Sequence, residues 1–561
     1  MKKFTTFFLT LLPFFGFSQT YEWAAVTGDT LTENSNALAI DASGNVYTTG
    51  VFIGTVDFDP GAGTFNLTAG GTADIFIQKL DALGNFVWAK QIITTGQGHG
   101  ESIVVDASGN IYVTGGFDGT ADFDPGAGTF NYTSGGGIVN AFILKLDAAG
   151  DFVWAKYALS TGTSVPRDLA VDASGNVYST GNFEETTDFD PGSGTAMLTS
   201  LAFRDAYIQK HDAAGNLLWV KQVSGTDISE GKSLAVDASG NTYITGKFWG
   251  TADFDPGVGV MSLTSAGADD TFILKLDTSG DLVWVKQMGG IDYEYGYSIE
   301  VDPAGNIYTT GSFQATVDFD PGVGTVNLTS AGLDDIYMIK LDAAGDFVWA
   351  KQIGGTGSEL SFSTVVDIVG NVYIAGAFEG TVDMDPGVGT TSLTSVGSFD
   401  IFFLKLDDMG DFIWVKHIGG IGIDFPFSMA VDASANLYAT GLFEDTVDFD
   451  PEAGIANQTS AGSFDIFVLK LNIGPLSPTT SPLIPKTLTA YPNPTNHQII
   501  IEGELSELEA FRLYNLTGQE VNSLVNIVRM DFSQVVLDLS SLPSGMYTFK
   551  TKNTVNKIYK W

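Results

Sequence analysis

Short stretches in which apolar and polar residues alternate recur along most of the chain, with turn sequences between them. In residues 293–355 these stretches are 297–301, 307–310, 336–341 and 347–351, and their period of two predicts four β-strands. The turns at 302–306 and 342–346 carry Gly, Asn and Asp, which favour tight turns. A longer connection, 317–335, joins the second strand to the third. The pattern predicts a unit of four antiparallel strands.

A tryptophan marks the fourth strand of each copy of this unit. The tryptophans stand 65 or 66 residues apart, and a phenylalanine that ends the second strand keeps the same period, which predicts packing between neighbouring units. The two series are Trp23, Trp88, Trp154, Trp219, Trp284, Trp349 and Trp414, and Phe52, Phe117, Phe183, Phe248, Phe313, Phe378 and Phe443.

Four short strands in each repeat of about 65 residues predict the blades of a β-propeller. A parallel β-helix is the competing architecture, but its coils are shorter and lack paired hairpin turns. The expected fold class is all-β.

The two ends of the repeat array complement each other. Residues 21–25 match a fourth strand, whereas the last copy supplies three strands, around Met429, Leu437 and Phe467, and stops at Asn472. An open gap would expose an unpaired strand edge, which natural sheets avoid. We therefore expect the N-terminal strand to close residues 19–474 into a seven-bladed ring.

The N-terminus has the pattern of a secretory signal peptide. Lys2 and Lys3 precede an apolar stretch, residues 4–17, and Gly16 and Ser18 suit a cleavage site before Gln19. We expect residues 1–18 to be this signal, with a buried N-terminal helix as the alternative. No cysteine follows for a lipid anchor, and no later stretch of about 20 apolar residues predicts a transmembrane helix.

The composition of the chain limits the classes of ligand and metal site that can be expected. The chain of 561 residues has a formal net charge of −40 and no cysteine. Such a charge repels phosphate backbones, so no nucleic-acid ligand is expected, and cations or cationic partners are favoured. The absence of cysteine excludes disulfides and thiolate metal sites.

The repeat resembles a known bacterial family. Residues 236–246 and 272–277, with their Asp-Ala-Ser-Gly-Asn turn and Phe-Ile-Leu-Lys-Leu-Asp strand, resemble the seven-bladed β-propeller repeat abbreviated SBBP. The resemblance covers about residues 20–472. It implies the fold and leaves the function open, because one fold hosts many activities.

The C-terminal part, from residue 475 onward, differs from the repeats in composition and pattern. Residues 475–488 form a linker rich in Pro, Ser and Thr, and the alternation in 489–561 predicts a small antiparallel β-sandwich of immunoglobulin-like type. The Tyr-Pro-Asn-Pro opening at 491–494, the segments 513–518 and 542–547 and the basic tail resemble the type A C-terminal sorting domain of type IX secretion in Bacteroidota.

That resemblance implies recognition of residues 489–561 by the type IX machinery and passage across the outer membrane. It also implies removal of the domain, with release of the protein or its attachment to surface lipopolysaccharide. The expected location is therefore secreted or on the outer-membrane surface. The alternative is an ordinary carbohydrate-binding or adhesive sandwich.

Each repeat carries an Asp-x-Asp-Pro motif. Side chains at i and i+2 of an extended chain share a face, so each pair could bind Ca²⁺, although the third acid and the bidentate Glu of a full calcium loop are missing. Asp also caps turn amides without an ion. Both readings stay open, and no cofactor is expected to be required. The pairs are Asp57/Asp59, Asp122/Asp124, Asp188/Asp190, Asp253/Asp255, Asp318/Asp320, Asp383/Asp385 and Asp448/Asp450.

The sequence offers little support for catalysis. The four histidines are isolated, and none belongs to a zinc-protease or serine-nucleophile motif. His211 and His417 are expected at the surface of hairpin strands. Paired acids for glycoside cleavage stay open because acidic residues are abundant. The sequence favours a protein without enzymatic activity.

The copies differ most between the fourth strand of one unit and the first strand of the next. These loops feed the innermost strands and rim the central channel, where a rigid scaffold commonly presents binding residues. Neutral drift in loops is the alternative explanation. The candidate binding residues are Glu33, His99, Glu101, Arg167, Glu230, Tyr293, Tyr295, Glu359, Phe425 and Phe427.

We therefore expect a secreted or cell-surface binding or adhesion module for an extracellular glycan or protein. The alternatives are an extracellular polysaccharide- or peptide-degrading enzyme and a structural component of a surface layer.

Overall fold

A computed structural model describes residues 20–474 apart from 136 and 193, and 489–491, 495, 497–502, 512–515, 521, 525–530, 534–550 and 555–560. The expected signal peptide (1–18) and linker (475–488) lie outside the described residues. The chain divides into two units, 1–476 and 477–561, each with its own core. All helix or strand structure in the described part of the chain is β-strand.

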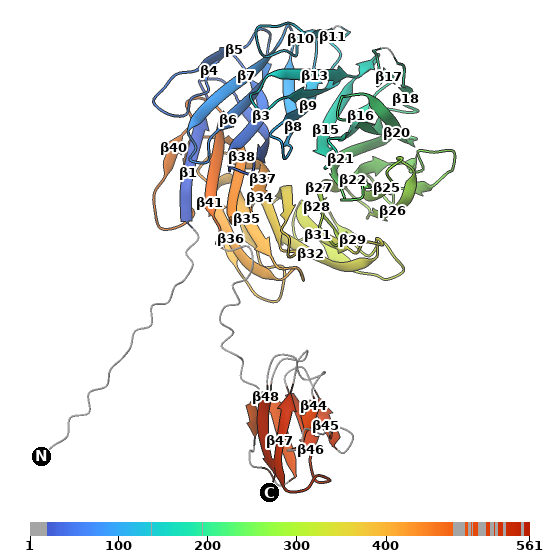
Figure 1. Ribbon diagram of the computed structural model, residues 1–561, viewed down its shortest axis with the longest axis vertical. Helices are drawn as coiled ribbons and strands as arrows, with labels where there is room; N and C mark the ends of the chain where they lie inside the picture. The colour runs from blue at the N-terminus through green and yellow to red at the C-terminus, as the bar shows by residue number, and fades with distance from the viewer. Residues whose placement is uncertain are drawn as a thin grey trace, which may run out of the picture. The chain divides into compact units, whose positions relative to one another are not determined.

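The first unit is built from four-stranded antiparallel repeats, whose sheets appear in chain order from blue to orange in Figure 1. The first three repeats comprise β2 (Asn34–Ile40), β3 (Val46–Phe52), β6 (Asp74–Leu80) and β7 (Phe86–Thr94); β8 (Gly98–Val105), β9 (Ile111–Phe117), β12 (Asn140–Leu146) and β13 (Phe152–Tyr157); and β15 (Ser164–Val171), β16 (Val177–Phe183), β19 (Asp205–His211) and β20 (Leu217–Gly225).

The remaining repeats have the same order of pairing. They comprise β21 (Ile228–Val236), β22 (Thr242–Trp249), β25 (Asp270–Leu276) and β26 (Leu282–Met288); β27 (Glu294–Val301), β28 (Ile307–Phe313), β31 (Asp335–Leu341) and β32 (Phe347–Gly355); β33 (Glu359–Val366), β34 (Val372–Asp383), β35 (Ser392–Leu406) and β36 (Phe412–Ile418); and β37 (Phe425–Val431), β38 (Asn436–Phe443), β41 (Asp465–Asn472) and β1 (Thr20–Thr27).

The N-terminal strand pairs with the C-terminal end of the repeat array. Strand β1 runs antiparallel to β41, with Tyr21 opposite Leu471 and Val26 opposite Phe467. The two strands lie side by side in Figure 1, blue against orange. Two further bonds join the last repeat to the first: the Leu38 amide donates to Ser428 Oγ at 3.1 Å, and Thr440 Oγ1 donates to Ser35 Oγ at 2.8 Å.

The connection between the second and third strands, which the sequence predicts as one long connection, contains short strands. In most repeats it folds into a hairpin of two three-residue strands, whereas in the repeat of β33 to β36 the hairpin continues β34 and β35. The separate hairpins are β4/β5 (Thr55–Asp57, Asn66–Thr68), β10/β11 (Thr120–Asp122, Asn131–Thr133), β17/β18 (Thr186–Asp188, Met197–Thr199), β23/β24 (Thr251–Asp253, Ser262–Thr264), β29/β30 (Thr316–Asp318, Asn327–Thr329) and β39/β40 (Thr446–Asp448, Asn457–Thr459); β14 (Leu159–Ser160) adds to β17.

The core lies between neighbouring sheets. Phe313 is fully buried in a cluster with Tyr243 and Ile273 of the preceding repeat, in line with the expected packing of the periodic phenylalanines. Burying such a side chain contributes about 1.5–3 kcal/mol, and each sheet can bury its faces only against its neighbours.

The periodic tryptophans bridge adjacent repeats. Trp219 Nε1 donates to the Thr278 carbonyl in the turn of the next repeat at 3.3 Å. Trp23 makes the same bond to Ala82 in the first repeat, also at 3.3 Å. The strand at the N-terminus therefore contacts the first repeat in the way that an internal fourth strand contacts its successor.

The second unit contains two antiparallel sheets. One sheet has the order β42 (Thr489–Tyr491), β43 (Gln498–Glu502), β46 (Gln534–Asp538), β45 (Asn526–Met530), and the other β44 (Arg512–Tyr514), β47 (Gly545–Lys550), β48 (Val555–Lys560). Ile499 and Leu537 of the first sheet and Leu513 and Phe549 of the second share one buried cluster. The Pro-Asn-Pro of the opening motif lies outside the described residues.

Candidate functional site

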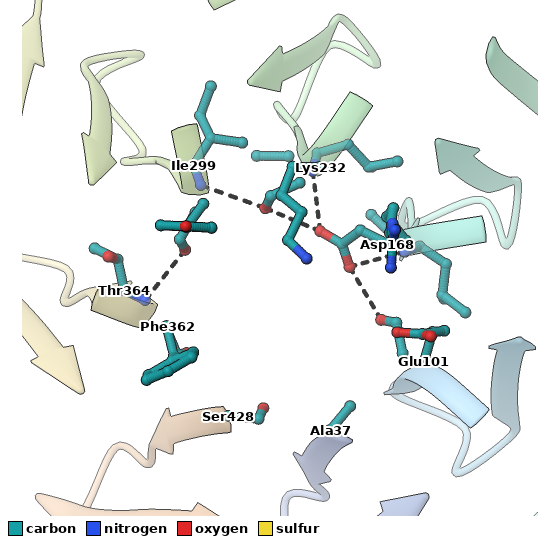
Figure 2. A pocket seen from close by; sticks show the side chains of 18 of the residues that line it. Ala37, Glu101, Asp168, Lys232, Ile299, Phe362, Thr364 and Ser428 are labelled. Atoms are coloured by element: carbon teal, nitrogen blue, oxygen red, sulfur yellow. Dashed lines mark hydrogen bonds between the residues drawn. The ribbon is translucent and has the colours of Figure 1, made fainter. Parts of the chain in front are cut away.

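The first strands of the repeats surround a cavity of about 590 Å³. We call these strands, β2, β8, β15, β21, β27, β33 and β37, the inner strands, and each contributes residues to the lining. Figure 2 shows their side chains pointing toward a common centre, with Lys232 extending into it and Phe362 on another side. A pocket of this volume lies in the range of small-molecule sites.

Each inner strand carries a β-bulge at the same position. The pairing with the second strand skips one residue there, and a bulge leaves the extra residue unpaired and re-aims its side chain. All the bulge residues line the cavity, and we call them the bulge ring: Asn36, Glu101, Arg167, Lys232, Tyr297, Phe362 and Phe427.

The bulge ring differs in chemistry from one side to the other. Four successive inner strands supply polar or charged residues, from Asn36 to Lys232, and the next three supply Tyr297, Phe362 and Phe427. The Phe362 and Phe427 rings lie 5.4 Å apart between centroids, in an edge-on arrangement. The backbone of the inner strands therefore repeats, whereas the chemistry of the side chains that line the cavity differs from repeat to repeat.

Aromatic side chains extend from the bulge ring toward the loops. Tyr293, Tyr295 and Tyr297 form a stacked series, with centroids 6.2 and 6.0 Å apart. Phe425 lies 5.4 Å from Phe362 and 6.0 Å from Phe427. We call these six residues of β27, β33, β37 and the loop before β27 the aromatic wall.

Except for Ala37 on β2, the side chain after each bulge forms a hydrogen bond with the neighbouring inner strand. At this position Ser298 Oγ accepts the Thr364 amide at 3.1 Å, and Ser363 Oγ accepts the Met429 amide at 3.2 Å. Asp168 replaces the serine on β15. Its carboxylate accepts hydrogen bonds from the hydroxyls of Ser102 and Ser233, both at 3.0 Å. It also accepts the Leu234 amide at 2.9 Å and the Leu169 amide. Burial raises the pKa of Asp168.

The two cations of the bulge ring, Arg167 and Lys232, differ from Asp168 in their contacts. Burial and the nearby Arg167 guanidinium lower the pKa of the Lys232 amine. Arg167 Nε is buried without a hydrogen-bond partner. Within the described ranges, neither side chain forms a hydrogen bond or ion pair.

Glu300 adds a carboxyl to the lining where the other repeats carry Ala or Val. It lies three residues beyond the bulge on β27. Burial, followed by the negative charge of Asp168, raises its pKa to about 8, so it holds a proton at neutral pH.

The structure brings several of the expected binding residues together. Glu101, Arg167 and Phe427 belong to the bulge ring, and Tyr293, Tyr295 and Phe425 belong to the aromatic wall. His99 Nε2 lies 3.5 Å from Glu101 Oε1, and burial lowers the pKa of this imidazole. Glu230 forms an ion pair with Arg204 at 2.8 Å.

Two of the candidate binding residues, Glu33 and Glu359, lie in the protein interior. Both are fully buried, and each carboxylate accepts the amide four residues earlier, from Asp29 at 3.0 Å and from Gly355 at 2.8 Å. Burial raises their pKa values to about 7 and about 8. The two acids cap loop amides near the start of the inner strand.

Other residues of the cavity were not predicted, because they lie on the inner strands and not in the variable loops. The missed residues are Asn36, Asp168, Lys232, Tyr297, Glu300 and Phe362. A signal was present: in an alignment of the copies at their own period, the bulge column varies from Asn to Glu, Arg, Lys, Tyr and Phe. The columns on either side are dominated by small residues.

The first aspartate of each Asp-x-Asp motif makes the same hydrogen bonds in every repeat. Asp318 Oδ1 accepts the Asp320 amide at 3.1 Å and the Val326 amide at 2.8 Å, which closes the loop between the short hairpin strands. The equivalent bonds are made by Asp57, Asp122, Asp188, Asp253, Asp383 and Asp448.

The second aspartate of the motif binds the turn that follows it. Asp320 Oδ1 accepts the Gly322 amide at 2.8 Å. The amide two residues further along is bound in the same way by Asp59, Asp124, Asp255, Asp385 and Asp450. Asp190 occupies the equivalent position, and its own amide donates to Asp188 Oδ1 at 3.1 Å. Both aspartates of the motif thus act as caps of turn amides.

The sequence also allowed these motifs to hold calcium. Among the residues described, no group of three or more His, Asp and Glu side chains is placed to hold a metal ion. The candidate ligands that are not gathered into such a group are Asp57, Asp59, Asp122, Asp124, Asp188, Asp190, Asp253, Asp255, Asp318, Asp320, Asp383, Asp385, Asp448 and Asp450. The bonds to turn amides support the capping role, and calcium binding stays a prediction.

His211 departs from its expected surface position. It is 2% exposed in β19, and burial lowers its pKa to about 4. The third strand lies inside the sheet, where both of its faces are covered. His417 is partly exposed and bonds Asp400 at 2.6 Å.

Comparison with known families bears out the two resemblances. Residues 218–254, 283–312 and 348–377 match the β-propeller repeat family, and residues 489–560 match the secretion system C-terminal sorting domain. The chain carries β-propeller repeats and a sorting domain. The sorting domain implies interaction with the type IX machinery and export to an extracellular or cell-surface location. The described residues contain no helix with the length and apolarity of a membrane span.

Curated relatives are distant and much longer. A WD repeat-containing protein of Acanthamoeba polyphaga mimivirus is 25% identical over 502 residues, covering 75% of this chain and 36% of the relative. The regulatory protein FlaEY of Caulobacter vibrioides is 23% identical over 264 residues, covering 46% and 27%. The chain thus spans about a third of the length of these relatives.

Among solved structures, a protein from Lactobacillus plantarum is 13% identical, with a TM-score of 0.37 and coverage of 75% of this chain and 99% of that one.

Proposed function

We propose that this protein is an extracellular binding module, in which a closed seven-bladed propeller presents a ligand site in its central channel. The observation that carries the proposal is the asymmetry of the bulge ring. Binding sites combine aromatic surface with a few placed polar groups, and the cavity has both.

Closure of the ring is supported by contacts between the two ends of the repeat array. Strand β1 pairs with β41, Trp23 donates to Ala82, and the Leu38 amide bonds Ser428. Internal neighbours make the same types of contact. We likewise propose an immunoglobulin-like sandwich for the C-terminal unit, supported by its two sheets and shared core.

For the route, we propose that residues 1–18 are a signal peptide and that the type IX machinery recognises residues 489–561 before their removal. The mature propeller would then act in the medium or on the outer-membrane surface. Its ligand would be an extracellular glycan or protein.

The test is a screen of the full-length protein against arrays of glycans and extracellular proteins. Phe362→Ala removes a ring from the centre of the aromatic wall, so we expect at least tenfold weaker binding of any ligand found. Phe65→Ala is the matched control, because Phe65 is an exposed aromatic residue that does not line the cavity. Equal binding by the folded Phe362→Ala protein would contradict a channel site.

A hydrolytic enzyme is the second candidate, supported by Glu300 alone. A cavity carboxyl with a pKa of about 8 can deliver a proton at neutral pH. Glu300→Gln should then abolish release of reducing ends or peptide fragments from polymers while leaving binding intact. Absence of turnover in the wild-type protein over a broad polymer panel would remove this candidate.

A further inference from the structure

Two cationic side chains of the channel site lack a partner among the described residues. Arg167 and Lys232 occupy the same bulge position on neighbouring inner strands, close enough for the guanidinium to lower the pKa of the amine. Arg167 Nε is buried and unpartnered. A buried charge without a partner is costly, and a ligand that supplies the opposite charge relieves that cost.

Most acids around these cations are already engaged. Asp168 accepts bonds from two serines and from backbone amides, and Glu230 pairs with Arg204. Glu101 lies 3.5 Å from the His99 imidazole and keeps its place in the cavity lining. Glu300 is protonated at neutral pH. The site therefore offers a carboxylate two cationic donors, whereas the one carboxylate that it offers a ligand ammonium is Glu101.

Hydroxyl groups lie next to the aromatic residues. Ser298, Ser363 and Ser428 follow Tyr297, Phe362 and Phe427 in sequence and also line the cavity. Each serine oxygen accepts an amide from the next inner strand, which leaves the hydroxyl hydrogen to donate. An aromatic surface bordered by hydroxyl donors suits a ring that has an apolar face and a hydroxylated edge.

We propose that the channel binds a carboxylated sugar unit of an acidic polysaccharide, with the carboxylate at Arg167 and Lys232 and the sugar ring against the aromatic wall. The inference rests on the proposed binding function and specifies its ligand. Arg suits this role because its planar group meets a carboxylate in a bidentate manner. The chain's net charge of −40 opposes approach of a polyanion, but physiological salt screens charges beyond about 8 Å.

The test is calorimetric titration of the full-length protein with galacturonate and glucuronate oligomers and with neutral galactose and glucose oligomers of equal length. We expect an acidic oligomer to bind at least tenfold more tightly than its neutral counterpart. Lys232→Met and Arg167→Met, which keep the side-chain length, should each weaken acidic binding at least tenfold. Lys351→Met is the control, since Lys351 forms a surface ion pair with Asp411.

Several outcomes would overturn the ligand class. They are equal affinity for neutral and acidic oligomers, unchanged acidic binding in folded Lys232→Met protein, and tighter binding of an acidic peptide than of any sugar. If acidic sugars fail while another ligand binds and is sensitive to Phe362→Ala, the ligand class is wrong and the binding function stands. If no ligand responds to Phe362→Ala, the binding function itself falls.

Discussion

At the scale of single residues, buried acids meet across several interfaces between repeats. Glu33, Glu294, Glu359 and Asp424 lie at or immediately before the start of inner strands, and each has a raised pKa because of burial. In each case a buried Asp of the preceding sheet raises this pKa further, as Asp270 does for Glu294. At the same position the other repeats carry Gly98, Ser164 and Ser229. Single substitutions between repeats thus decide where acid pairs occur.

These acids make stability depend on pH. The pKa of Glu294 rises from 4.5 to about 8, chiefly because the side chain is buried. The negative charges of Asp270, Asp292 and Asp269 raise it further. Lys247 forms an ion pair with Asp269. The folded protein therefore binds more protons than the unfolded chain between about pH 4.5 and 8. Stability should fall as pH rises through that window and stay low above it.

Glu294→Gln replaces the protonated acid with an uncharged amide of the same shape. We expect the unfolding free energy at pH 8.5 to increase by about 1–3 kcal/mol and to vary less between pH 5 and 8.5. Urea unfolding at both pH values measures the change. Asp281→Asn, at an exposed surface acid, is the control, and an equal effect there would contradict a specific role for the buried acid.

At the scale of elements, the strands and tight turns followed from local pattern, because alternation and turn residues act over a few positions. Predicted strands such as 336–341 and 347–351 correspond to β31 and β32. The three-residue hairpin strands were missed because they are too short to show a period. The bulges were missed as well, since a bulge is a property of pairing between two strands.

The Asp-x-Asp motif gives a prediction at this scale. Asp318→Ala removes the bonds to the Asp320 and Val326 amides, which should destabilise the protein by about 1–2 kcal/mol. Because the protein's own amides already bind Asp318 Oδ1, a chelator should leave the melting midpoint of the wild-type protein unchanged. A midpoint lowered by chelator and restored by calcium would instead establish the Ca²⁺ site that the motif also allows.

At the scale of the whole molecule, the two ends of the repeat array meet through β1. The first strand can matter as much as an internal strand only if the array closes. In a closed ring each blade buries both of its faces, and no blade is terminal.

A matched pair of substitutions tests closure. Trp23→Ala and Trp219→Ala remove the same ring and the same bond to the next repeat, one at the chain end and one inside the array. For a closed ring we expect both to cost about 2–4 kcal/mol in urea unfolding. A cost for Trp23→Ala that is much smaller than for Trp219→Ala would indicate an open array.

The sequence by itself determined the repeat, its four strands, the two units of the chain and the sorting domain, because these depend on local patterning and on motifs read in order. It also placed Glu101, Arg167 and Phe427 among the candidate binding residues. Only the tertiary structure decided which variable residues share a space. Residues 65 positions apart, such as Lys232 and Tyr297, become neighbours when inner strands lie side by side. The same packing buries Glu33 and Glu359, since the environment of a side chain is set by other repeats and not by its own sequence.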